Sequence, residues 1–204
     1  PYLAAGGGTY IAATFDAGDS ESRQQYLEDY RASLSDPARY GTVEYSVFSG
    51  GGDPAAPAGT ADMVLTFRNV HNWMGGGWAD QGFASMYDAL KPGGILGVVE
   101  HRLPEDRDEA PGAPTGYVKQ STVIAMAEAA GFVFVESSEI NANPADSADH
   151  PFGVWTLPPT LRAGNYGEEQ DPDFDREPYK AIGESDRMTL KFRKPLAADG
   201  AMLE

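Results

Sequence analysis

The chain has 204 residues, enough for one domain with a substantial core. It carries 31 Asp and Glu against 15 Lys and Arg, and this formal charge of −16 repels phosphate backbones and anionic membranes. We therefore expect a small-molecule substrate, no nucleic acid and no membrane as partners, and the oligomeric state stays open. No cysteine is present, which excludes disulfides and thiolate metal sites but does not identify the compartment.

The first half of the chain predicts alternating strands and helices. An apolar run over residues 9–15 suits a buried strand, and Ser20 can cap a helix that Asp36 and the following proline end. A second strand is expected over residues 43–48. The third, residues 62–67, is almost continuously apolar, as is typical of a parallel strand covered on both faces.

The second half continues the alternation. A helix is expected over residues 79–90, with its apolar side chains on one side, and a strand over residues 95–99. A further helix over residues 117–130 ends where Gly131 can adopt the left-handed conformation, and a strand begins at residue 132. Right-handed crossovers between such strands build a parallel sheet.

The end of the chain differs in pattern. Residues 141–185 predict a long irregular segment, of the kind that often forms a lid over a site. Residues 187–193 alternate between apolar and polar side chains, which suits an antiparallel or edge strand. We therefore expect residues 1–204 to form a single α/β domain, a Rossmann-like three-layer sandwich with a mostly parallel sheet and an antiparallel last strand.

Several motifs resemble those of class I S-adenosylmethionine-dependent methyltransferases. The element order, the LKPGG turn at residues 90–94 and AAGF at residues 129–132 are similar to that class. DMVLTFRNVHNW at residues 62–73, HPFGVWTLPP at residues 150–159 and GESDRM at residues 183–188 resemble a family of predicted bacterial methyltransferases of unassigned substrate. The resemblance covers nearly the whole chain, and it implies S-adenosylmethionine as cofactor.

Such enzymes begin with a strand, a glycine-rich turn and a helix. Here the sequence opens at what resembles the end of that helix, and the glycines at residues 6–8 precede a strand. We therefore expect the first strand and the cofactor loop upstream of residue 1, and without them two unpaired sheet edges and an open apolar slot. The compartment is left open: cytoplasmic by default, or periplasmic if a signal peptide lies upstream.

In open α/β sheets, ligands bind at the carboxyl ends of the strands. Asp16 ends the first strand, where the resemblance implies that its carboxylate accepts hydrogen bonds from the cofactor ribose; a helix cap is the alternative. Phe48 and Ser49 end the second strand, where related enzymes bracket the adenine, and core packing is the alternative.

The segment after the third strand carries most of the candidate chemistry. Arg68 can hold the carboxylate of the cofactor, and Asn69 can contact both the cofactor and the reacting groups. His71 is the candidate catalytic base. Asn72 and Trp73 are candidate substrate contacts. Loop capping, or a core role for the tryptophan, could explain one or two of these residues.

His101, after the fourth strand, and Trp155, in the lid, complete the candidate substrate site. His71, His101 and His150 together raise an alternative, in which an inactive methyltransferase-like protein binds a small ligand or a divalent metal. Glu100 adjoins His101, but neighbouring strand residues should point to opposite faces. We therefore expect no metal, and methyl transfer to an unidentified small acceptor.

Overall fold

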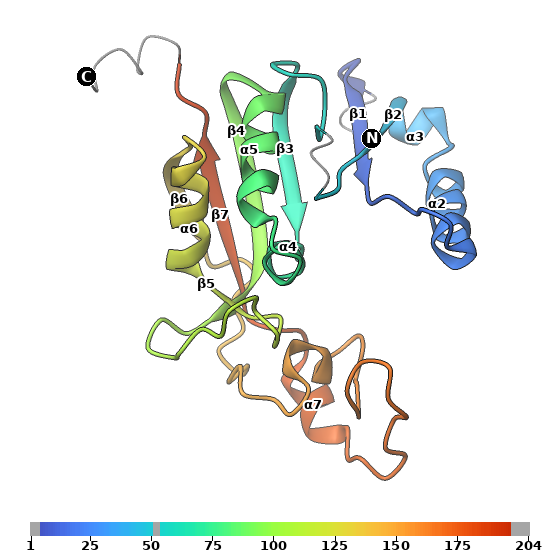
Figure 1. Cartoon of the computed structure of the whole chain (residues 1–204), viewed down its shortest axis with the longest axis vertical. Helices are drawn as coiled ribbons and strands as arrows, with labels where there is room; N and C mark the ends of the chain where they lie inside the picture. The colour runs from blue at the N-terminus through green and yellow to red at the C-terminus, as the bar shows by residue number, and fades with distance from the viewer. Residues whose placement is uncertain (1–4, 51–53, 197–204) are drawn as a thin grey trace.

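The computed structural model describes residues 5–50 and 54–196, so the expected helix tail at residues 1–4 lies outside the described part. Strand β1 (Thr9–Thr14) pairs in parallel with β2 (Thr42–Val47). Two helices connect them, α2 (Glu21–Ser33) and α3 (Pro37–Tyr40). This unit forms one side of the molecule (Figure 1).

The second sheet has the strand order β3–β4–β7–β6. Strand β3 (Ala61–Phe67) runs parallel to β4 (Leu90–Leu103), whose end also pairs in parallel with the short β5 (Val118–Lys119). Strand β7 (Arg187–Arg193) lies antiparallel between β4 and β6 (Val133–Ser138). The predicted antiparallel last strand is therefore confirmed, and it occupies an interior position of this sheet.

Helices α5 (Ala79–Ala89) and α6 (Gln120–Ala129) pack on one face of the second sheet. Alternate residues of β4 and β7 point into this core, because successive side chains of a strand face opposite ways. Its fully buried members include Phe83, Leu96, Val98, Leu190 and Phe192. Gly131 has a φ of 101°, so the left-handed helix end expected after α6 is confirmed.

The opposite face and the outer edge of β3 are open among the described residues. Met63, Leu65 and Phe67 lie at alternate positions of β3 and are each more than half exposed. Within residues 5–50 and 54–196, β3 pairs with β4 alone and β1 with β2 alone. The expectation of two unpaired edges next to apolar side chains is therefore confirmed for the described part of the chain.

Residues 141–185, the lid segment, lie across the carboxyl ends of β3 and β4 (Figure 1). The segment is mostly irregular and contains two short helices, η1 (Gly153–Thr156) and α7 (Glu177–Ile182). Both are shorter than two turns, too short for a clear apolar periodicity. The segment is anchored by Asp186, which binds Arg102 at 2.8 Å and accepts a hydrogen bond from the backbone of Asn143.

Other short elements also escaped prediction. Helix α4 (Val70–Gly75) follows two residues after β3 and has only six residues. Helix α3 and strand β5 are shorter still. The LKPGG turn does not separate α5 from its strand, because β4 already begins at Leu90 and the turn forms an irregularity in its pairing with β3. No described helix is long and apolar enough to cross a membrane.

Candidate active site

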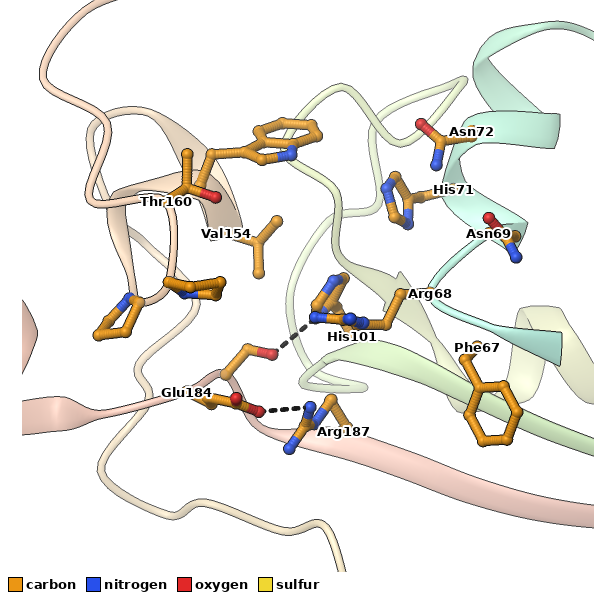
Figure 2. Close-up of a pocket in the computed structure, with 14 residues that line it drawn as sticks. Phe67, Arg68, Asn69, His71, Asn72, His101, Val154, Thr160, Glu184 and Arg187 are labelled. Atoms are coloured by element: carbon orange, nitrogen blue, oxygen red, sulfur yellow. Dashed lines mark hydrogen bonds and ion pairs between the residues drawn. The ribbon is translucent and has the colours of Figure 1, made fainter. Parts of the chain in front are cut away.

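A cavity of about 350 Å³ lies between the carboxyl ends of β3 and β4 and the lid segment (Figure 2). We call it the histidine cavity, because His71 and His101 both line it. Its other lining residues come from the segment after β3, from the lid segment and from the start of β7: Phe67, Arg68, Asn69, Asn72, Val154, Trp155, Pro158, Pro159, Thr160, Glu184, Ser185 and Arg187.

A sharp turn at Arg68 brings the chain from β3 into α4. Its φ of 57° lies in the left-handed region, which is uncommon for a residue with a side chain, and its backbone N–H donates to Val99 of β4 at 2.7 Å. Asn69 takes the position before the first turn of α4 and donates to the Thr66 hydroxyl at 3.4 Å. The turn thereby places His71 over the end of β4.

His71 forms a buried pair with Glu100 of β4. The ring Nδ1 lies 2.9 Å from Glu100 Oε1, and the backbone N–H of His71 donates to Oε2 at 3.2 Å. The backbone N–H of His101 donates to Oε1 at 2.9 Å. Glu100 is 0 % exposed, and a carboxylate buried this deeply needs such donors to offset its lost hydration.

The pairing decides which nitrogen of His71 is free to react. An ionised carboxylate only accepts hydrogen bonds, so Nδ1 of His71 carries the hydrogen that it donates to Glu100. In a neutral imidazole Nε2 then holds a lone pair. His71 is therefore held in the form in which Nε2 can take a proton or bind a metal.

His101 stands beside His71, with the ring centroids 5.4 Å apart. Its Nδ1 lies 2.6 Å from the Ser185 hydroxyl. Burial lowers the pKa of His101, Glu100 opposes the shift and nearby His71 and Arg68 add to it, so that the pKa is about 4. His101 is therefore neutral at physiological pH.

The expectation that Glu100 and His101 point apart was wrong. His71, Glu100 and His101 each offer a potential ligand atom, and these atoms lie within 4.8 Å of one another. The two residues lie near the end of β4, where the Glu100 carboxylate bends back to the N–H of His101 and α4 brings His71 to meet both. Strand alternation fixes the direction of Cβ but not the end of a long side chain.

His150 does not join this cluster. Its Nε2 lies 2.8 Å from Asp146 Oδ1, and it lines a second cavity of about 580 Å³. The three-histidine set considered from the sequence is therefore not assembled. Trp155 lines both cavities and carries Arg162 over its ring at 4.9 Å. A contact between Trp155 and the substrate stays a prediction.

Two arginines add positive charge to the histidine cavity. Arg68 is exposed, and no carboxylate within the described ranges forms an ion pair with it. Arg187 pairs with Glu184 at 2.6 Å, and its buried Nε has no hydrogen-bond partner among the described residues. Asp186, next to Arg187 in the chain, binds Arg102 and accepts from the backbone N–H of Asn143.

No protein-family model matches the chain, and no curated protein matches it. Solved structures do. An S-adenosylmethionine-dependent methyltransferase from Methanosarcina mazei is 9 % identical, with a TM-score of 0.58 over 96 % of this chain and 86 % of that one. PigF, solved with SAH, is 12 % identical, with a TM-score of 0.51 over 93 % of this chain and 44 % of PigF. The chain has the fold of S-adenosylmethionine-dependent methyltransferases.

A structure with a different activity in its name also matches this chain. The [4+2]-cyclase SpnF is 16 % identical to this chain, with a TM-score of 0.50 over 93 % of this chain and 66 % of the cyclase. At such identities the likeness establishes the fold, and a fold hosts many functions. The residues of the site must therefore carry the functional argument.

The remaining candidates lie away from the cavity. Asp16 follows β1, is exposed, and accepts a hydrogen bond from Gly18 N–H at 2.9 Å through Oδ1. Phe48 is partly buried, with its ring edge-on to Trp73 and Trp78. Trp73 itself is 6 % exposed within the main core, so its expected position at the substrate site was wrong. Ser49 follows Phe48 at the end of β2.

Sequence reasoning considered Glu100 only as a carboxylate beside a metal-binding set of histidines, not as the partner of His71, and it missed Ser185. Glu100 carried one signal: it is an acid directly after the apolar run Ile95–Val99, where burial would demand a partner. Ser185 carried none, because its role depends on the fold of the lid segment against β4. Both residues act by holding a histidine.

Proposed function

We propose that this protein transfers a methyl group from S-adenosylmethionine to a small acceptor bound in the histidine cavity. The observation that carries the proposal is the His71–Glu100 pair at a cavity on the carboxyl edge of a methyltransferase fold. Ligands of open α/β sheets collect at this edge. The fold neighbours support methyl transfer in general, and the acceptor is a small molecule of unidentified structure.

The residues present fit the cofactor in two places. Asp16 has one carboxylate oxygen engaged by Gly18, and the other can accept from a ribose hydroxyl. Arg68 lacks an ion-pair partner in the described part of the chain, so its guanidinium can bind the methionine carboxylate, with Asn69 beside it. Phe48 and Ser49 are the proposed adenine contacts. When bound, S-adenosylmethionine supplies an electrophilic methyl group.

The chain's own residues then bind, orient and deprotonate the acceptor. Nε2 of His71 accepts the proton that the acceptor loses, and Glu100 stabilises the imidazolium that results. Asn69 and Asn72 offer amides that can orient the reacting groups, and Trp155 and His101 form further walls. Alignment and exclusion of water are the main tasks, because the methyl group is already activated.

The proposal is tested by calorimetric titration of the full chain with S-adenosylmethionine and S-adenosylhomocysteine. We expect micromolar binding that weakens at least about tenfold in Asp16→Ala, which corresponds to about 1.4 kcal/mol. Asp19→Ala is the matched control, since Asp19 is an exposed acid three residues away, and it should bind as the wild type does.

Absence of binding by a folded protein would contradict the proposal and favour a binding protein without catalysis. Binding of both ligands, without label transfer from methyl-labelled S-adenosylmethionine to a panel of small hydroxyl, amine and carboxylate acceptors, would contradict catalysis alone. Binding that is equally weak in the Asp16 and Asp19 variants would remove Asp16 from the ribose site.

A further inference from the structure

We propose that His71, Glu100 and His101 form a binding site for one divalent transition-metal ion, with zinc as the reference ion. The proposal stands on the geometry of the cluster and does not depend on methyl transfer. It differs from the set considered from the sequence, because His150 is not part of it and Glu100 converges with His71 and His101.

The three side chains converge on one point. One potential ligand atom from each of the three residues lies within 4.8 Å of the other two, and all three residues are buried. Two imidazoles and one carboxylate are a ligand set that suits Zn²⁺ or Fe²⁺, and zinc sites with two histidines and one glutamate are well known. Because the chain has no cysteine, softer thiolate sites are excluded.

Hydrogen bonds fix the orientation of both rings. Metal-binding histidines usually have their other ring nitrogen held by a carboxylate or another polar group. Nδ1 of His101 is held by Ser185, so its other ring nitrogen is left for an ion. Nδ1 of His71 and Oε1 of Glu100 lie 2.9 Å apart, so an ion bound by both takes the place of the hydrogen between them, and Glu100 supplies the negative charge. Figure 2 shows the two rings beside one hollow.

The cluster is open to an ion from outside. His71 and His101 line the histidine cavity, which gives an ion a way in and leaves room for water or a ligand on the open side. Protein ligands on one side and an open position on the other are typical of zinc sites that bind a further molecule. Both cavity arginines oppose a cation, but the charge of Arg187 is offset by its pair with Glu184, whereas Arg68 forms no ion pair within the described part of the chain.

A metal ion at Nδ1 of His71 leaves the ring hydrogen of the neutral imidazole on Nε2, the nitrogen that takes the acceptor proton in the proposed reaction. Zinc binding therefore blocks the proton-accepting state. Zinc bound to the cluster would thus inhibit the proposed reaction. Metal binding itself is measured without any transfer activity.

The test is titration of the metal-stripped full chain with Zn²⁺ by calorimetry and with Co²⁺ by visible absorption. We expect one ion per chain, and affinity at least about tenfold weaker in His71→Gln and in His101→Gln. Glu100→Gln should weaken binding by at least about tenfold, because it removes the one negatively charged ligand. Arg68→Met should strengthen it, because it removes the opposing charge.

His150→Gln is the matched control, since His150 is also buried and paired with a carboxylate. It should bind the metal as the wild type does. Because substitutions of buried residues can impair folding, the wild type gives an independent measurement: the chain has three histidines, so their NMR signals can be followed one by one. Zinc should shift the signals of His71 and His101 and leave that of His150 in place.

Failure of the folded wild type to bind one ion, or a His150 signal that shifts with the others, would overturn the proposal. So would equal loss of affinity in the His150 and His71 variants. None of these outcomes affects the calorimetry with S-adenosylmethionine, so the two proposals fail separately.

Discussion

The protein contains two buried histidine–carboxylate pairs that look alike in isolation and differ in their surroundings. His71 and Glu100 lie 2.9 Å apart, and His150 and Asp146 lie 2.8 Å apart. Glu100 has a second imidazole, His101, beside it. Both His71 and His150 line a cavity, so burial, pairing and access alone do not distinguish the two pairs; the second imidazole beside Glu100 does.

Asp146 instead uses its oxygens to hold the lid segment together. It accepts from the Tyr117 hydroxyl at 3.0 and 3.1 Å, and from the backbone N–H groups of Ala148 and Asp186 at 2.9 and 2.8 Å. Burial, together with the charge of Asp146, raises the pKa of Tyr117, so this hydroxyl remains a donor. The carboxylate is fully engaged, which fits a structural role.

The largest effect is expected for Asp146→Ala. The substitution leaves the Tyr117 hydroxyl, His150 and two backbone N–H groups without their acceptor, so we expect a loss of about 3–5 kcal/mol in the free energy of unfolding. Urea denaturation measures it. Asp149→Ala, three residues away and exposed, should change stability by less than about 0.5 kcal/mol. A small effect of Asp146→Ala on stability would contradict the structural role of the His150–Asp146 pair.

Glu100→Gln should have an intermediate effect. Glutamine keeps the shape of the side chain and one acceptor oxygen, but one of the three donors to Glu100 then meets an NH₂ group. We expect a loss of about 1–3 kcal/mol, measured by the same denaturation experiment. Asp146→Asn is the corresponding isosteric change; if it weakened Co²⁺ binding as much as Glu100→Gln does, the distinction between the two pairs would be lost.

The smallest effect is expected for Glu139→Gln. Glu139 binds Arg102, the residue after His101 in β4, at 2.7 Å. The side chain of Glu139 is 62 % exposed. Arg102 also keeps its bonds to Asp186, so stability should change by less than about 1 kcal/mol. Thermal unfolding checks this expectation. A cost equal to that of Glu100→Gln would show that exposure is not what separates these carboxylates.

The sequence by itself determined the main strands and longer helices, because apolar side chains recur with the period of the element that they bury. It placed the strands at residues 62–67 and 187–193 within one residue of β3 and β7, and it gave the last strand its antiparallel direction. It also placed Arg68, Asn69 and His71 after β3, at the edge where the cavity forms.

Only the tertiary structure decided which of these residues meet. Trp73 packs in the core against aromatic neighbours. Glu100 and Ser185 contact the two histidines because α4 and the lid segment fold against the end of β4. His150 pairs with Asp146, four residues earlier in the chain, and lies outside the His71–Glu100–His101 cluster. Local periodicity specifies which face of an element is buried, but the meeting of side chains from distant segments depends on packing across the whole fold.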